Sequence, residues 1–498
     1  MAMQLSKSDY MMYLKHPAWL WLKKHDKAKL PEIDENLHAI FDTGHAFEPY
    51  AESRFPGGVQ LGFADFSEYK TLPARTHEEL AKGTKTLFQG RLEFEELTCI
   101  FDILDRVETN LFDLYEIKSS TKEKTEHIED LAFQKHVLEK SGIPIRNLFV
   151  IVANTNYVRQ GEIDANELTQ VIDVTARVNE LAEQTLANID KALAVMHSKE
   201  RPDISPRHVQ QHYLKEWLEI FLSLHANTDP YSIYRLSSLR GDLIGELEDQ
   251  GIELIQQIPD EYGFENAKHK RVVALAKQGS PVIQGEAVSS FLRTLQFPLY
   301  FFDYETMSSV IPLFDGTRPY QQVPMQYSLH ILREPGDQLE HKEFLHQSDS
   351  NPGLPLLTQL KQDIGETGSV LVWYEAFEKG RNQELGQMFP EYLTFVEQLN
   401  MRVVDLMKPF SEGWYEDYRF LGSASIKKVL PVLAPDLSYK EMEIGDGQTA
   451  QRIWMETILE KKHLLKQEQI MRNLLAYCKL DTLAMVRIYK FLIACSGL

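Results

Sequence analysis

The most informative hydrophobic pattern lies at residues 298–306, which are apolar and aromatic until two acids appear near the end. A run of this length that begins at a proline predicts a buried β-strand. Since side chains at positions i and i+2 of a strand point to the same face, Asp303 and Glu305 are expected to converge. Neighbouring anions in an apolar setting repel each other, so a divalent cation between them is one interpretation. A strand end that faces solvent is the other.

Other segments show the periodicities of helices and strands. Residues 5–24 predict two amphipathic helices separated by Pro17, and residues 40–51 continue helically. Two strand-like runs joined by a polar turn predict a β-hairpin at 99–107 and 111–118. We expect further strands at 143–154, 324–332, 368–375 and 401–407, and further helices at 127–138, 174–198, 379–387 and 474–486.

Composition indicates an ordinary soluble protein. A chain of 498 residues with 43% hydrophobic content is long enough for about two or three domains with real cores. It contains no apolar stretch of about 18 residues, and its first residues lack the apolar core of a signal peptide. We therefore expect a cytoplasmic protein without a membrane partner. The three cysteines, Cys99, Cys478 and Cys495, are too scattered for a disulfide framework or a cysteine-only metal site, so a metal would be bound by oxygen.

The net charge of −20 argues against a protein that coats nucleic acid indiscriminately, because phosphate binding requires dense lysine and arginine surfaces. It does not exclude a nuclease. Short basic clusters, such as those at 122–124, 269–271 and 427–428, could supply local positive potential. Such clusters are more often solvated faces, so they carry little weight here.

The hairpin at 99–118 carries a second candidate site. Glu116 and Lys118 share a face of its second strand, and Asp102 lies on the first. Two acids that hold Mg²⁺ beside a lysine that stabilises negative charge are what metal-dependent phosphodiester hydrolysis requires. A solvent-facing Glu–Lys pair is the alternative, but Asp102 and the nearby Gln134 of the following helix weaken it. Asp105 is another candidate for the role of Asp102, but side chains three residues apart in a strand point to opposite faces.

These residues resemble a known nuclease core. Asp102, Glu116-Ile-Lys118 and Gln134, preceded by Gly44-His45, are similar to PD-(D/E)xK nucleases in their RecB-like form. The resemblance implies that Asp102 and Glu116 bind metal with His45 as an additional ligand. It also implies that Lys118 is the catalytic lysine and Gln134 a positioning residue. Without the resemblance, a lone histidine in a helix is more often a packed or capping group.

Further acids extend the pair at residues 303–305. Glu378 lies where a strand runs into a helix, near the positive end of the helix dipole. Tyr477 and Asp481 are four residues apart in the last helix and therefore share one face. Asp405 ends another apolar run and is the alternative to Glu378 as an additional acid of this site.

This order resembles the DnaQ-like 3′–5′ exonucleases of the DEDDy type, which have an RNase H-like fold. The resemblance implies that four acids hold two Mg²⁺ or Mn²⁺ ions and that Tyr477 orients the attacking water; these acids are Asp303, Glu305, Glu378 and Asp481. A phenol with an ordinary pKa near 10 is a poor base, so water activation falls to the metal. The second acid of the family is usually aspartate, whereas Glu378 is glutamate.

Together the resemblances match a bacterial family of uncharacterised proteins that fuses the two nuclease types. They imply an α/β protein with a PD-(D/E)xK restriction-endonuclease-like domain at 1–200, a helical connector at 201–285 and an RNase H-like exonuclease domain at 286–498. Many RecB-like nucleases carry cysteines for an iron–sulfur cluster near the start of such a connector, but this chain has none at 205–208, so no cluster is expected.

The expected function is metal-dependent hydrolysis of nucleic acid, with DNA favoured and RNA possible as the partner. The C-terminal site would be a 3′–5′ exonuclease. One alternative is a nucleic-acid-binding scaffold in which one nuclease domain is inactive. Another is a hydrolase of small nucleotides, which the negative net charge would suit better.

Overall fold

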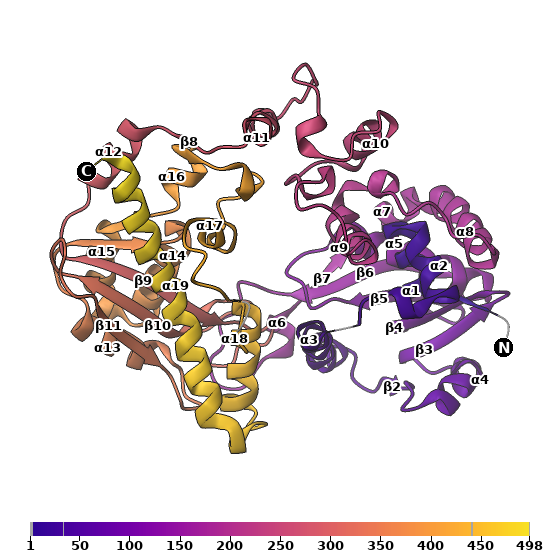
Figure 1. Ribbon diagram of the computed structural model, residues 1–498. Coiled ribbons are helices and arrows are strands. Elements are labelled where there is room, and N and C mark those ends of the chain that lie inside the picture. The colour runs from indigo at the N-terminus through magenta and orange to yellow at the C-terminus, as the bar shows by residue number, and fades with distance from the viewer. Residues whose placement is uncertain (1–2, 33, 440–441, 498) are drawn as a thin grey trace. The chain divides into compact units, whose positions relative to one another are not determined.

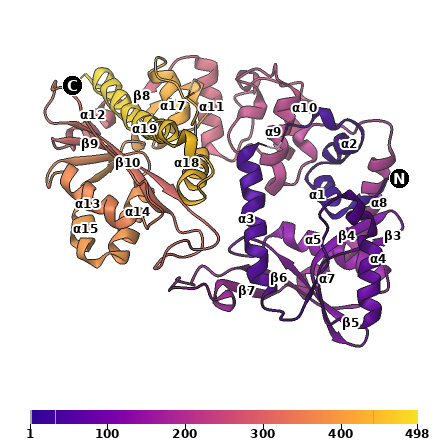
Figure 2. The ribbon, with the colours of Figure 1, turned by 90° about the horizontal axis from the view of Figure 1, so that it is seen from below.

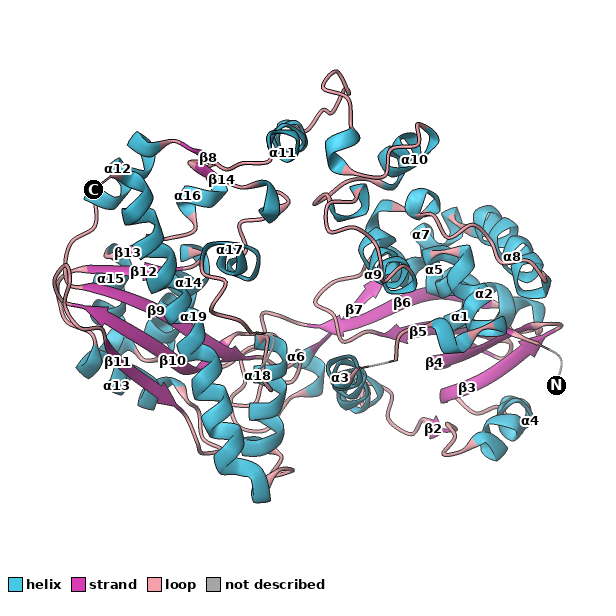
Figure 3. Ribbon diagram, in the orientation of Figure 1, coloured by secondary structure: helices cyan, strands magenta, loops and turns pink. Residues whose placement is uncertain are grey.

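Figure 1 shows a computed structural model of the chain, which describes residues 3–32, 34–439 and 442–497. The chain forms two compact units. The N-terminal unit consists of Met1–Thr228, Leu239–Asp249 and Ser309–Tyr320, and the C-terminal unit consists of Asp229–Ser238, Gln250–Ser308 and Gln321–Leu498. Each unit combines a β-sheet with helices (Figure 3), which confirms the expected mixed α/β class.

The N-terminal unit is built on a mixed sheet. In the described part of the chain its strand order is β2-β3-β4-β5-β6-β7, and β1 pairs with β4. Neighbouring strands from β3 to β5 are antiparallel, β6 is parallel to β5, and β7 is antiparallel to β6. The strands are β1 (Leu5–Ser6), β2 (Val59–Gln60), β3 (Thr86–Phe94), β4 (Leu97–Glu108), β5 (Leu111–Ile117), β6 (Ile145–Ala153) and β7 (Thr169–Asp173).

Helices cover both faces of this sheet (Figure 1). The described α-helices of this unit are α1 (Lys7–Lys15), α2 (Pro17–His25), α3 (Glu35–Glu52), α4 (Phe66–Lys82), α5 (Thr125–Lys140), α6 (Ala165–Leu168), α7 (Thr175–Glu180), α8 (Ala182–His197), α9 (Leu214–Leu224) and α10 (Gly241–Asp249). Tyr10 of α1 stacks on Phe133 of α5 at 4.8 Å between ring centroids, which joins these two helices on one side. The long helix expected at 174–198 is interrupted at Leu181, where α7 ends and α8 begins.

The connection between β9 and β10 contributes to the N-terminal unit. Arg159 donates hydrogen bonds to the carbonyl oxygens of Pro312, at 2.9 Å, and Leu313, at 2.8 Å. The hydroxyl of Tyr320 donates to the carbonyl oxygen of Ser119. The chain around Ser119, which follows Lys118, is therefore held in part by residues that come two hundred positions later.

The C-terminal unit contains a second mixed sheet, with the order β11-β10-β9-β12-β13 among its described strands. The strands β9, β10 and β11 are antiparallel neighbours, whereas β12 runs parallel to β9 and β13 parallel to β12. Their bounds are β9 (Leu299–Met307), β10 (Val323–Leu332), β11 (Glu340–Leu345), β12 (Ser369–Val372) and β13 (Val403–Asp405), and a separate pair is formed by β8 (Val282–Ile283) and β14 (Tyr415–Glu416).

Helices also cover both faces of this second sheet (Figure 2). The described α-helices of this unit are α11 (Ala267–Gln278), α12 (Gly285–Arg293), α13 (Gly353–Asp363), α14 (Glu375–Met388), α15 (Leu393–Met401), α16 (Lys408–Ser411), α17 (Ile426–Leu433), α18 (Gly447–Trp454) and α19 (Gln467–Ser496). Phe301 of β9 packs in a cluster with α12 and α19, whereas Phe302 packs in a cluster with α13, α14 and α15. By the alternation of a strand, Asp303 and Glu305 belong to the α19 face.

Among the described residues, no helix combines the length and apolarity that crossing a lipid bilayer would require.

Gly368 provides a test of the C-terminal fold. It has a φ of 90°, and a Cβ at this position would lie 2.1 Å from the carbonyl oxygen of Pro298. We expect Gly368→Ala to lower the free energy of unfolding of this unit by about 3 kcal/mol, because the backbone itself must move. Gly336→Ala is the control, since its φ is 91° but its Cβ would meet no atom within 4 Å, and it should cost about 1 kcal/mol. Equal losses in urea denaturation would contradict this account.

Candidate metal centres

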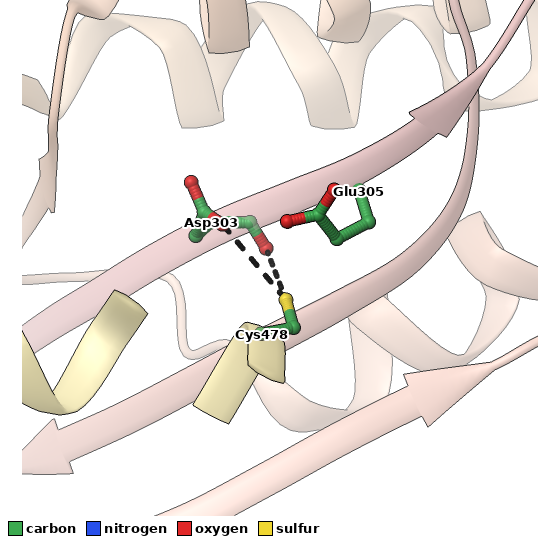
Figure 4. Close-up of side chains that lie close together, drawn as sticks. All are labelled: Asp303, Glu305 and Cys478. Atoms are coloured by element: carbon green, nitrogen blue, oxygen red, sulfur yellow. Dashed lines mark hydrogen bonds between the residues drawn. The ribbon is translucent and has the colours of Figure 1, made fainter. Parts of the chain in front are cut away.

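Strand β9 and helix α19 bring three potential ligands together in the C-terminal unit. Ligand atoms of Asp303, Glu305 and Cys478 all lie within 4.8 Å of one another. Figure 4 shows the side chains of these three residues close together. The sulfur of Cys478 lies 3.9 Å from Oδ2 of Asp303. Tyr477 and Asp481 are also buried on α19, at 4% and 8% exposed. The strand and helix periodicities therefore place Asp303 and Glu305 opposite the helix that carries Asp481, another of the predicted acids.

Burial and mutual repulsion govern the carboxylates of Asp303, Glu305, Glu378 and Asp481, which we call the acidic cluster. Burial, and then the charge of Asp481, raise the pKa of Asp303 and of Glu305 well above their ordinary values. Burial also raises the pKa of Glu378 to about 8 and that of Asp481 to about 6. The four groups thus disfavour simultaneous ionisation, which a divalent cation among them would relieve.

Glu378 and Asp405, the two rivals for the second acid, have different surroundings. Asp405 accepts hydrogen bonds from the backbone N–H groups of Tyr374, Glu375 and Met407, at 3.1, 3.2 and 2.9 Å. It therefore secures the start of α14. Glu378 lies in the first turn of α14, is 2% exposed, and leaves its buried Oε2 without a hydrogen-bond partner. Of the two, Glu378 is the carboxylate with a free ligand atom.

Two residues that sequence reasoning did not assign to this site lie beside it. The hydroxyl of Tyr439 donates a 2.6 Å hydrogen bond to Oδ1 of Asp481. The ammonium of Lys427 lies 5.8 Å from the ring centre of Tyr439 and 6.0 Å from that of Tyr477. No short-range spacing links Tyr439 to the acids, and Lys427 stood out only as part of a basic pair. The position of both residues beside this site therefore depends on the tertiary structure.

Glu116 is the centre of the corresponding group in the N-terminal unit. It is 1% exposed, and its Oε1 lies 2.6 Å from the ammonium of Lys118 and 2.9 Å from that of Lys7. Gln134 donates to its Oε2 at 2.7 Å. Asp130 of α5 receives hydrogen bonds from Lys118, at 3.0 Å, and Gln134, at 2.9 Å. Besides β5 and the residue that follows it, α1 and α5 thus contribute to one polar network.

Asp102 faces the same network and differs from Glu116 in its protonation. Its Oδ2 accepts a 2.7 Å hydrogen bond from the backbone N–H of Ile117. Burial, and then the charge of Glu116, raise the pKa of Asp102 to about 7. Burial also disfavours the Glu116 carboxylate, but Lys118 and Lys7 outweigh it and hold the pKa of Glu116 well below its usual range. Asp105 is occupied elsewhere, with Lys85 and Thr86 each 2.6 Å away.

His45 is not brought to these acids in this structure. Its side chain is 74% exposed and its Nδ1 lies 3.1 Å from Glu48. Within the described residues no hydrogen bond or ion pair joins its ring to Asp102 or Glu116. Conversely, Lys7 and Asp130 were not predicted. The spacing of Asp130 four residues before Gln134 was a usable signal, whereas Lys7 lies 109 positions from Glu116 and carried none.

The C-terminal centre fits Mg²⁺ or Mn²⁺ better than the N-terminal centre does. These hard cations prefer carboxylate oxygens, which the acidic cluster supplies together with the unpartnered Oε2 of Glu378. Burial raises the pKa of Cys478 well above its ordinary value, so this group is a neutral thiol in the metal-free protein. In the N-terminal centre a metal would compete with two lysines for Glu116.

The acidic cluster predicts a pH dependence of stability. With its pKa raised from an ordinary value near 4.5 to about 8, Glu378 binds more protons in the folded than in the unfolded protein between these values. In EDTA, the free energy of unfolding of the C-terminal unit should therefore fall from pH 5 to pH 8, by roughly 3 kcal/mol. Glu378→Gln should flatten this slope. Glu375→Gln should not, because Lys379 and Lys408 hold the pKa of Glu375 below its ordinary value and so outside this pH range. A slope unchanged by Glu378→Gln in urea titrations would contradict the assignment.

Comparison with known proteins identifies relatives without an assigned activity. The chain is similar to the Uncharacterized protein MG366 of Mycoplasma genitalium, with 26% identity over 212 residues that make up 39% of this chain and 31% of that protein. It is also similar to the Uncharacterized protein UU173 of Ureaplasma parvum, with 23% identity over 240 residues that make up 44% of this chain and 34% of that protein. The chain thus spans about a third of the length of these curated relatives. No solved structure matches it significantly. Residues 300–425, which include Asp303, Glu305 and Glu378, match the family model described as a Domain of unknown function (DUF2779).

Proposed function

We propose that this protein is a metal-dependent nuclease with two phosphodiesterase centres, and that the C-terminal one is a 3′–5′ exonuclease. The acidic cluster carries the proposal, because Asp303 and Glu305 of β9 lie close together and the charges of Glu378 of α14 and Asp481 of α19 raise the pKa of Asp303. The hydroxyl of Tyr477 on α19 donates a hydrogen bond to Asp481. This supports an RNase H-like exonuclease of the DEDDy type in the C-terminal unit. The Glu116, Lys118 and Gln134 network supports a RecB-like PD-(D/E)xK centre in the N-terminal unit.

In the C-terminal centre, the acidic cluster would hold Mg²⁺ or Mn²⁺. Bound there, the cation supplies Lewis-acid activation of water and stabilises negative charge on the phosphoryl group. Burial raises the pKa of Tyr477 far above its ordinary value, so its hydroxyl stays protonated and orients a water molecule by hydrogen bonding. Tyr439 fixes the orientation of Asp481 through its 2.6 Å hydrogen bond.

In the N-terminal centre, Asp102 and Glu116 would hold the metal. Gln134 fixes Glu116 through its 2.7 Å hydrogen bond to Oε2, and the backbone N–H of Ile117 fixes Asp102 at 2.7 Å. Lys118, which lies 2.6 Å from Glu116, is placed to stabilise negative charge that develops on a phosphate next to the same carboxylate.

One observation favours a second candidate function for the N-terminal unit. Lys7 and Lys118 already neutralise Glu116, so this carboxylate does not require a metal to compensate its charge. A unit in that state would bind nucleic acid and position it without cutting it. The chain would then be an exonuclease joined to a nucleic-acid-binding scaffold.

Labelled substrates test both proposals. We expect the protein to shorten 5′-labelled single- or double-stranded DNA from its 3′ end in Mg²⁺ or Mn²⁺, with RNA as a weaker substrate and no activity in EDTA. Asp303→Asn should reduce the ladder of shortened products at least about 100-fold, because one of four ligands loses its charge. Cys478→Ser is the matched control and should remain active.

Each outcome of this assay has a defined meaning. If no substrate is cut in either metal, the nuclease proposal is wrong, and cleavage of free nucleotides alone would identify a small-nucleotide hydrolase. If Glu116→Gln leaves every product unchanged while Asp303→Asn removes them all, the N-terminal unit is a scaffold.

Tyr477→Phe separates water orientation from metal binding. Removal of the hydroxyl should lower kcat of the exonuclease reaction by about 10- to 100-fold, because the water loses an orienting hydrogen bond. The affinity for Mn²⁺, measured by calorimetry, should remain unchanged, since the acidic cluster is intact. A variant with full kcat would remove Tyr477 from the proposed mechanism.

A further inference from the structure

Lys7 reaches the N-terminal centre from the first turn of α1. Its ammonium lies 2.9 Å from Oε1 of Glu116 and 3.6 Å from Oδ2 of Asp130. Lys118 contacts the same two oxygen atoms at 2.6 and 3.0 Å. Two lysines from separate elements therefore converge on one pair of carboxylates, although one lysine would suffice to neutralise Glu116.

The backbone before Lys7 is held firmly in the sheet. Leu5 of β1 is fully buried and pairs with Leu97 of β4. Ser6 caps α1 in a capping box with Asp9, and Lys24 of α2 donates to Asp9 at 2.7 Å. These contacts fix the direction in which the Lys7 side chain leaves the backbone. The side chain itself is a flexible stem that ends in an ammonium with three N–H donors.

The formal charges show why a second lysine would be useful during nucleic-acid binding. With Asp102, Glu116 and Asp130 ionised and Lys7 and Lys118 protonated, the group carries a charge of −1. A divalent cation would change this value to +1, which matches the single negative charge of a phosphodiester. Without Lys7 the same metal-loaded group would be neutral and would attract the nucleic-acid backbone less.

We propose that Lys7 is a second phosphate-binding lysine of the N-terminal centre. With a metal bound to Glu116, the ammonium of Lys7 would be free to contact a phosphate oxygen of the nucleic-acid backbone. The inference rests on the proposed nuclease function of this unit. Because Lys7 belongs to α1, its positive charge would reach the centre only when α1 is packed against α5.

The test uses the full chain with Asp303→Asn, so that cleavage reports the N-terminal centre. In this background, Lys7→Met should lower single-turnover cleavage of labelled DNA by about tenfold or more. The slope of log K for DNA against log salt, measured in Ca²⁺ as a substitute for Mg²⁺, should decrease in size by about 1, as for one lost phosphate contact. Mn²⁺ should bind at least as tightly, because a competing ammonium is gone.

Two further variants distinguish phosphate binding from a structural role. Lys7→Arg should restore most of the cleavage and the salt slope, whereas Lys7→Gln, which can still donate to Glu116, should not. Lys15→Met is the matched control, since Lys15 ends the same helix with a similar exposed fraction, 20% against 21% for Lys7, but pairs with Glu216. It should leave cleavage and salt slope unchanged.

The outcomes separate this inference from the proposed function. If the Asp303→Asn protein cuts DNA and Lys7→Gln matches it in rate and salt slope, Lys7 is a structural ion-pair partner and the inference is overturned. If the Asp303→Asn protein neither cuts nor binds DNA, the proposed function of the N-terminal unit fails, and the role of Lys7 fails with it. Loss of cleavage without a change in salt slope also overturns phosphate binding.

Discussion

Buried negative charge is the constraint on which the rest of this structure depends. Transfer of a carboxylate from water into an apolar core is strongly unfavourable unless it is paired, protonated or bound to a cation. Asp303 and Glu305 nevertheless lie on a strand in which the preceding residues, Phe301 and Phe302, are fully buried. The apolar packing of β9 on both faces therefore supplies the rigidity and stability that hold repelling groups close together. Removal of a charge at this position should relieve repulsion while removing a ligand.

The two units satisfy this constraint by different means. In the N-terminal unit, lysines and a glutamine amide from other elements compensate Glu116, and its pKa falls. In the C-terminal unit, burial raises the pKa of Glu378 to about 8, and its Oε2 has no hydrogen-bond partner. One centre therefore carries its compensating cations within the chain, whereas the other depends on protons or a bound cation. This difference explains why we expect pH and metal to affect the stability of the C-terminal unit more strongly.

Several site residues were predictable because their spacing matches a local periodicity. The two-residue repeat of a strand placed Asp303 and Glu305 on one face, and the turn of a helix did the same for Tyr477 and Asp481. The helix containing Glu378 was also expected, although it begins at Glu375 rather than beside the acid. Local periodicity failed for the helix at 174–198, where the sequence pattern continues through Leu181 but the backbone does not.

Local spacing was enough to predict which site residues share a face of a strand or helix, because that depends on backbone repeats of a few residues. The sequence also supplied the candidate acids of both centres. Only the tertiary structure decided that Asp405 caps a helix while Glu378 keeps a free oxygen. It likewise placed His45 against Glu48 and brought Lys7 to Glu116 across 109 positions. The physical reason is that such contacts depend on how separate elements pack, and no local spacing in the chain encodes that packing.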